Sequence, residues 1–399
     1  MVIRFHSKHS LKHHNLSEFL TLEFLVAYAW ILPVVIEAVS GLAGMLIGNT
    51  TLVTMALYMV LFLGILVHLS KLNYCFSYVD LGIFSFFSVS ILGTLVFFPE
   101  NTEFIQARLA VWPNLILYFV IGKLSRYTEG VIRWIYKASK FGIVFGLIAY
   151  YIVFGASGKD MTLAYIFLPC LLGVITGFFY EKKVSYLVLS VFGLWLQFLL
   201  GTRGPLLFVI LYTGYQFFFY CDNWKKKILL FASMALAFVL IQENVYMPIV
   251  NQVNKFLLSK GIKSEILFLF TTHNTASIDI RGDFYNTLLN ISFSKPFAIH
   301  GLCGDYVVGN VYAHNIIIEV IFEYGLIIGT SICVVFFAWL SNIFFKCYKN
   351  RMKRDLYVLV ACGLLLKFFL SGSFFGDLQF CFALAFLSAL WDQVKCKKF

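Results

Sequence analysis

Apolar residues recur along the chain in runs of about 20, each bounded by charged or turn-forming residues. A helix of that length crosses the hydrocarbon core of a bilayer with its backbone hydrogen bonds satisfied internally. The pattern predicts an all-α polytopic membrane protein with about 12 transmembrane helices in a single domain over residues 1–399. They are expected near 24–40, 51–69, 79–98, 107–122, 141–156, 161–180, 184–200, 205–220, 228–242, 315–345, 356–370 and 378–391, and the first could continue through 41–47.

Composition supports this prediction and excludes a water-soluble domain. Hydrophobic residues make up 60% of the chain and charged residues 13%, against roughly half and a quarter in a soluble domain. The net charge of +11 would suggest a nucleic-acid partner in a soluble protein. Here the basic residues lie beside the predicted helices, with no aromatic-interleaved basic patch, so no nucleic-acid partner is expected.

The distribution of these basic residues predicts the orientation of the chain. With the N-terminus inside, most of the 31 Lys and Arg fall in cytoplasmic segments, as the positive-inside rule requires. Both termini are therefore expected on the cytoplasmic side of the membrane. The segments are 1–20, Lys71, 123–140, 182–183, 225–227, 346–354 and 395–398.

The longest predicted extramembrane segment, residues 243–313, is expected to be a loop on the outer face of the membrane. Its single cysteine, Cys303, should then react with a membrane-impermeant thiol reagent added from the outer side. Cys396 should react only after the membrane is opened. The nine cysteines form no CxxC pair or Cys/His cluster, so neither a structural zinc site nor a disulfide is required.

Two arginines and a histidine lie at the predicted outer edges of helices: Arg203, Arg281 and His314. Each alone is more often an interfacial anchor or a helix cap. Together they suggest a phosphate site, because the planar guanidinium fork binds phosphate oxygens bidentately and stays charged. Two guanidinium groups could hold a pyrophosphate and stabilise it as a leaving group without metal. The carboxylates of Asp279, Asp283 and Asp305 leave open an Mg²⁺ cage as the alternative.

Residues 296–329 carry the most specific pattern in the chain, PFAIHGLCGDYVVGNVYAHNIIIEVIFEYGLIIG. The pattern resembles the superfamily of O-antigen polymerases (Wzy) and O-antigen ligases (WaaL). Members have an Arg-led periplasmic segment, a P-x-x-G-x-G turn and an H-N-x-x-x-E/Q-x-x-x-E-x-G helix start. The matching positions are Arg203, Arg281, Pro296, Gly301, Gly304, His314, Asn315, Glu319, Glu323 and Gly325. Two departures are Tyr285, where an aromatic that is usually Trp is expected, and a stretched Pro-to-Gly spacing around His300.

The resemblance implies a GT-C-like fold in a bacterial inner membrane, with residues 243–313 as a large periplasmic loop. Neither a cofactor nor a metal is expected. The resemblance also implies a donor and an acceptor that are oligosaccharides linked to undecaprenyl pyrophosphate, with a chain-length regulator as a further partner. By the same resemblance, His314, Arg203 and Arg281 are catalytic residues. The two arginines would bind the pyrophosphate, and His314 would act as general base or orient the acceptor hydroxyl. The residues expected to contact substrate are Arg203, Arg281, Tyr285, Tyr312, Asn315 and Glu319.

Three functions remain open at this point. The first is an inverting glycosyltransferase that polymerises lipid-linked repeat units at the periplasmic face. The second, an O-antigen ligase, differs only in its acceptor, the lipid A core. The third, a secondary transporter or lipid-linked sugar exporter, is less favoured because it should show repeat symmetry and mid-bilayer binding residues.

Glu319 and Glu323 share one face of their predicted helix, because side chains four residues apart are neighbours. A carboxylate inside a membrane helix is costly, so the pair is expected to face either an aqueous cavity or Lys367 on the next helix.

Overall fold

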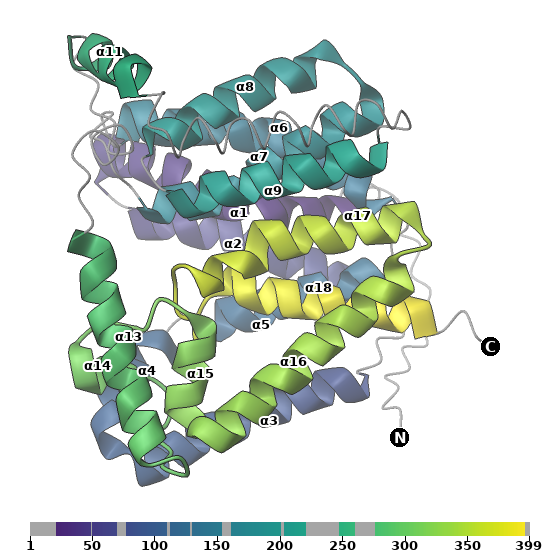
Figure 1. Cartoon of the computed structure of the whole chain (residues 1–399). Helices are drawn as coiled ribbons and strands as arrows, with labels where there is room; N and C mark the ends of the chain where they lie inside the picture. Colours follow the sequence, from purple (N-terminus) through teal and green to yellow (C-terminus); the bar gives the residue numbers. More distant parts are fainter. Residues whose placement is uncertain are drawn as a thin grey trace, which may run out of the picture. The chain divides into compact units, whose positions relative to one another are not determined.

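The structure is a computed structural model that describes residues 21–48, 50–69, 77–109, 112–127, 130–153, 161–200, 203–220, 247–259 and 276–395. Every regular element in these ranges is a helix, which confirms the all-α prediction (Figure 1). The predicted helix at 228–242 and the basic residues of 1–20, Lys71 and 225–227 lie outside the described residues.

Six described helices are long and apolar enough to cross a membrane, so the protein is a polytopic membrane protein. They are α1 (Leu22–Ile47), α2 (Thr50–Leu69), α3 (Tyr78–Phe97), α6 (Val131–Ile148) with the π-helical turn η3 (Ala149–Val153), α7 (Met161–Glu181) and α16 (Leu326–Cys347). Helix α1 does continue through 41–47. Shorter apolar helices are α8 (Val184–Leu199), α9 (Arg203–Tyr220) and α18 (Leu378–Lys395).

One further pair of helices passes the same length and hydropathy test only when taken together. The 3₁₀ turn η1 (Pro99–Asn101) and α4 (Thr102–Leu109) meet α5 (Trp112–Leu124) at 61°, so the helix predicted over 107–122 is divided between α4 and α5. The remaining described elements are η2 (Ser125–Tyr127), α11 (Met247–Ser259), α13 (Ala276–Ser294), α14 (Gly304–Gly309), α15 (Ile316–Tyr324), α17 (Arg351–Val360), η4 (Ala361–Leu365) and η5 (Leu366–Phe369).

The helices form two compact units, and the division falls within α1 and α2 and near the start of α6. The first unit contains α3, α4, α5 and everything from α13 to the C-terminus. The second contains α7, α8, α9, α11 and most of α6. In the second unit, the Tyr212 hydroxyl on α9 lies 2.6 Å from the Thr176 hydroxyl on α7 and accepts a bond from Gln216.

The predicted continuous helix over 315–345 is wrong, because the chain breaks into α15 and α16 at Gly325. Gly325 has φ +80°, a left-handed conformation that glycine adopts without a steric penalty. A Cβ there would lie 2.8 Å from the Ala298 carbonyl oxygen, so the loop before α14 can approach only a glycine. The break makes α15 a short, separate helix that packs against the first turns of α16.

In the first unit, α5 and α18 lie side by side (Figure 1). Gly122 on α5 permits this, since a Cβ there would lie 2.7 Å from the Phe382 carbonyl oxygen on α18.

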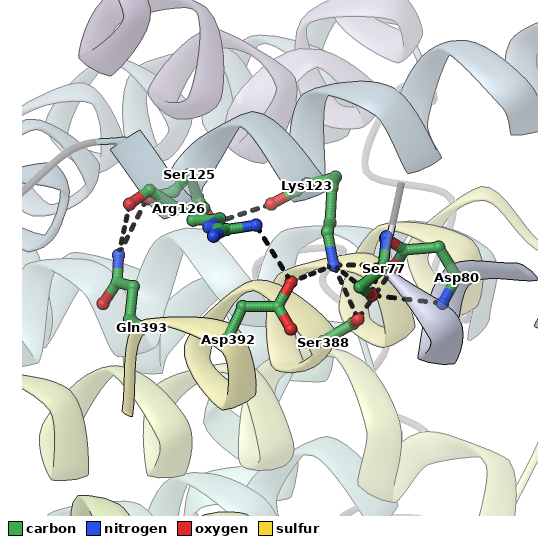
Figure 2. Close-up of polar contacts among 9 residues, drawn as sticks. Ser77, Asp80, Lys123, Ser125, Arg126, Ser388, Asp392 and Gln393 are labelled. Carbon is green, nitrogen blue, oxygen red and sulfur yellow. Dashed lines mark hydrogen bonds and ion pairs between the residues drawn. The ribbon is translucent and has the colours of Figure 1, made fainter. Parts of the chain in front are cut away.

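A buried charge network joins α3, α5 and α18 at one end of this contact (Figure 2). The Lys123 ammonium lies 2.7 Å from Asp80 Oδ1 and 2.7 Å from Asp392 Oδ2, and it donates to the Ser388 hydroxyl at 2.8 Å. Arg126 reaches Asp392 at 3.5 Å. Lys123 is only 1% exposed, so this predicted cytoplasmic loop charge is a buried partner of two aspartates.

We predict that Lys123→Met lowers the free energy of unfolding by about 3–5 kcal/mol, because it leaves Asp80 and Asp392 buried without their cation. Thermal unfolding of the purified protein in detergent measures the effect. The exposed Lys137→Met on α6 is the matched control and should unfold like wild type. Adding Asp80→Asn to Lys123→Met should restore part of the loss. A Lys123→Met protein as stable as wild type would contradict the role of the network.

Candidate functional site

The loop between α13 and α14 is fixed by the C-terminal end of α15. The backbone N–H groups of His300 and Gly301 both donate to the Glu323 carbonyl oxygen, at 3.0 and 2.9 Å. The imidazole of His300 stacks on Phe322 with ring centroids 4.1 Å apart. These bonds satisfy a helix-end carbonyl that the break at Gly325 would leave without a partner. Glycine fits at position 301 because φ there is +73°, a left-handed conformation that glycine adopts without a steric penalty.

A second set of bonds ties this loop to the α3–η1 corner. The Leu302 N–H donates to the Thr94 hydroxyl at 2.9 Å. The Asn101 amide donates to the carbonyl oxygens of His300 and Leu302, at 2.8 and 2.9 Å. The loop is therefore held from two sides, and it positions the chain that leads through α14 to His314.

His314 lies between α14 and α15 with φ +55°, and its ring packs on Tyr312 with centroids 3.9 Å apart. Its Nδ1 is buried and has no hydrogen-bond partner among the described residues. Burial, followed by the nearby charge of Arg281, lowers the pKa of His314 to about 4. The imidazole is therefore neutral at physiological pH and has a nitrogen available to a ligand.

Arg281 and Tyr285 lie one turn apart on α13. The Arg281 guanidinium makes one long bond, 3.5 Å, to the Leu370 carbonyl oxygen, and most of its donors remain available to a ligand. Burial raises the pKa of Tyr285, and the charge of Arg281 opposes that shift. Leu288 on α13 packs with Ala313 and Phe322 in a small core that holds α13 against α15.

The side chains of Asn315 and Glu319 form hydrogen bonds within the protein. Asn315 Oδ1 caps α15 by accepting the N–H groups of Ile317 and Ile318, and its amide donates to the Phe369 carbonyl oxygen at 3.1 Å. Glu319 is 1% exposed and accepts a bond from the Ser373 hydroxyl. The substrate contacts expected of both residues stay predictions.

Arg203 is the first residue of α9 and belongs to the second unit, and its side chain lies outside the described residues. Its pairing with Arg281 stays a prediction. The same holds for the Asp279 side chain. Of the remaining cage residues, Asp283 is exposed on α13, whereas Asp305 is fully buried. Asp305 lies in a different group of carboxylates, with Glu319 and Glu323.

Lys367 is not the partner of this glutamate pair. Its ammonium forms an ion pair with Asp377 at 2.7 Å and a hydrogen bond to Gln379 at 2.6 Å. A lysine on a neighbouring element is a common candidate partner for a buried glutamate. Here the ammonium of Lys367 is instead bonded to Asp377, ten residues further along the same segment.

Arg108, on α4, is a central residue that the motif does not contain. It donates to the Ser373 hydroxyl and the Phe375 carbonyl oxygen at 2.6 Å, and to the Tyr306 hydroxyl at 2.5 Å. Its guanidinium also lies 4.9 Å from the centre of the Tyr306 ring. One feature of the sequence could have pointed to Arg108. It lies on the predicted outer side of the membrane, where the positive-inside rule predicts few Lys and Arg.

An apolar groove of about 540 Å³ lies in the same unit as His314. Its walls come from α3, α15, α16 and α18, and include Phe86, Ile317, Phe336 and Phe374. Ile316 and Ile317, which follow directly after His314 and Asn315, line it too. A cavity of this volume is of the size that holds a small ligand, and its walls suit a hydrocarbon chain.

The expected labelling of Cys303 is wrong. Its side chain is 1% exposed, and burial raises the pKa of the thiol, so little reactive thiolate is available.

The orientation can be tested at Val308, which is 44% exposed in α14. We predict that Val308→Cys, in a protein whose other cysteines are replaced, reacts with an impermeant maleimide added to spheroplasts. Cys396, retained alone, should react only after detergent is added. Labelling of Cys396 in intact spheroplasts would reverse the orientation.

Comparisons with family models, with curated proteins and with solved structures return no match for this chain.

Proposed function

We propose that this protein is a polysaccharide polymerase of the inner membrane, an inverting glycosyltransferase that joins repeat units carried on undecaprenyl pyrophosphate at the periplasmic face. In this proposal the chain has about 12 transmembrane helices in a GT-C-like arrangement. The observation that carries the proposal is the position of His314, whose unpartnered Nδ1 lies near the charge of Arg281 and directly before two residues of the apolar groove. The resemblance of residues 281–325 to the Wzy and WaaL superfamily supports the same chemistry.

The substrate explains why these three features belong together. Along the length of a lipid-linked sugar, a hydrocarbon tail is followed by a pyrophosphate and then by the reacting anomeric carbon. The groove suits the tail, the guanidinium of Arg281 suits the pyrophosphate, and a neutral histidine suits the acceptor hydroxyl. Arg203 is the second pyrophosphate ligand in this proposal.

The reaction is a displacement at the anomeric carbon of the growing chain. The acceptor hydroxyl of the incoming unit attacks from the face opposite the pyrophosphate, His314 accepts the hydroxyl proton, and the bond to the pyrophosphate breaks with inversion. Fixed guanidinium donors stabilise the negative charge that develops on the leaving pyrophosphate. Tyr285 and Tyr312 lie beside Arg281 and His314 and would contact the sugar or the lipid phosphate.

We predict that His314→Gln reduces glycan joining by about 10² to 10⁴, the range typical of general-base catalysis, while protein level and donor binding stay unchanged. Gln keeps the size and hydrogen bonding of a merely structural histidine. The measurement is the ladder of lipid-linked glycan in a strain that lacks the native gene and carries the variant. A normal ladder would remove His314 from the mechanism.

The lowered pKa of His314 adds a pH test to the same experiment. Because the folded pKa is about 4, the base stays neutral as the pH falls, so activity of the wild type should hold to roughly pH 5 and then decline. A histidine at its ordinary pKa would lose activity already near pH 6.5. A decline centred there would contradict the buried, neutral state of His314.

For the arginines, we predict that Arg281→Ala or Arg203→Ala lowers turnover by about 10² to 10³, the loss typical of one transition-state donor. Lysine at either position should rescue only part of the activity, since a point charge cannot reproduce the bidentate fork. The loss in the alanine variants and the rescue by lysine are both measured from the product ladder that purified protein makes from a lipid-linked oligosaccharide. Arg133→Ala, an exposed arginine on α6, is the control. Full rescue by lysine at both positions would show that charge alone suffices.

A further inference from the structure

Three buried carboxylates lie together next to the proposed active site. Asp305 comes from α14, and Glu319 and Glu323 come from successive turns of α15. One carboxylate oxygen of each lies within 4.8 Å of the others. The three residues are 0%, 1% and 0% exposed, so water does not screen their mutual repulsion. Such a group needs a positively charged partner or bound protons.

No described side chain supplies enough positive charge. None of the three carboxylates has a Lys, Arg or His nitrogen within 4.0 Å among the ion pairs of the described residues. Arg108 is the cation that interacts with them electrostatically, but its donors go to Ser373, Phe375 and Tyr306. Three carboxylates and one guanidinium leave a net charge of −2 when all are ionised, which one divalent cation would balance.

The hydrogen bonds around the carboxylates give a separate indication of a ligand. Oε2 of Glu319 and Oε2 of Glu323 are buried and have no hydrogen-bond partner. Leaving a buried acceptor without a partner is costly, and more so for a charged group. These two side chains are more than nine-tenths buried and belong to the same group of carboxylates, so their unpartnered oxygens are available to an ion held there.

The other oxygens are already held by hydrogen-bond donors. Asp305 accepts the Tyr306 and Ala313 N–H groups, at 3.0 and 2.7 Å, and Glu323 Oε1 accepts the Cys303 N–H at 2.6 Å. The Ser373 hydroxyl donates to Glu319 Oε1. Donors aimed at a carboxylate favour its ionised form, which is the form that binds a metal cation, whereas burial opposes ionisation unless a cation is bound.

From this geometry we propose that Asp305, Glu319 and Glu323 bind one divalent cation of calcium size. Three carboxylates are hard oxygen ligands, which select Ca²⁺, Mg²⁺ or Mn²⁺ over softer metals. The three oxygens lie close enough together to share one ion. A buried set of protein carboxylates suits Ca²⁺ better than Mg²⁺, which dehydrates reluctantly and usually keeps several waters. Bound there, the cation would tie α14 to α15 and so fix the ends of the segment that carries His314.

The test uses the full-length protein in detergent, treated with chelator and then dialysed against Ca²⁺, Mg²⁺ or Mn²⁺. We expect about one Ca²⁺ per chain by mass spectrometry and a melting temperature that rises with Ca²⁺ concentration, because an ion that binds only the folded state stabilises it. Glu323→Gln should weaken Ca²⁺ binding at least about tenfold, since it removes one charged ligand. Glu103→Gln, an exposed glutamate on α4, should bind like wild type.

Each other outcome overturns the proposal. A wild-type protein that binds no divalent ion and becomes more stable as the pH falls would show that the carboxylates share protons only. Equal binding by wild type and Glu323→Gln would place the ion elsewhere. If Glu323→Gln does not fold, Asp305→Asn and the metal content of the wild type decide. None of these measurements uses glycan, so their outcome is separate from that of the proposed function.

Discussion

The helix α15 is the constraint on which the site depends, because both of its ends are fixed by polar contacts. Asn315 caps its N-terminal N–H groups, and the Glu323 carbonyl oxygen at its other end accepts two N–H groups from the loop before α14. Gly325 makes this possible by ending the helix in a conformation that other residues rarely adopt. His314, Tyr312 and the acidic group are all placed by this one short helix. A continuous helix through 315–345 would have no end at which the loop could bind.

The first unit handles buried charge in two different ways. Around Lys123, two aspartates and two basic residues balance within the fold, and the ammonium is fully bonded. Around Glu323, three carboxylates face one guanidinium whose donors are used elsewhere. Buried ion pairs repay their desolvation only when geometry and hydrogen bonds are complete. The first network meets this condition by itself and joins helices, whereas the second would meet it with the proposed cation.

The proposed reaction and the proposed cation occupy neighbouring but distinct places. His314 and Arg281 keep polar atoms available for a substrate, and the apolar groove starts two residues after His314. The carboxylates of the acidic group, in contrast, are buried in the interior of the same unit. Arg108 connects the two, since it holds Tyr306 and, through Ser373, touches Glu319. A change in the acidic group would reach His314 through the hydrogen bond from the Ala313 N–H to Asp305, and through Tyr306, whose ring packs on Tyr312.

The sequence by itself determined that the chain is helical and membrane-embedded, because helix length and apolar content follow from composition and period alone. It also predicted that a helix begins at Asn315, whose side chain caps α15. It did not predict the end of that helix at Gly325, because the apolar run continues to residue 345. Only the tertiary structure decided which charges meet. Lys123 meets Asp392, 269 residues away, Lys367 meets Asp377 rather than a glutamate, and Asp305 joins Glu319 and Glu323. The apolar faces of membrane helices are chemically alike, so the period of a helix shows which face is buried but not which helix it will contact.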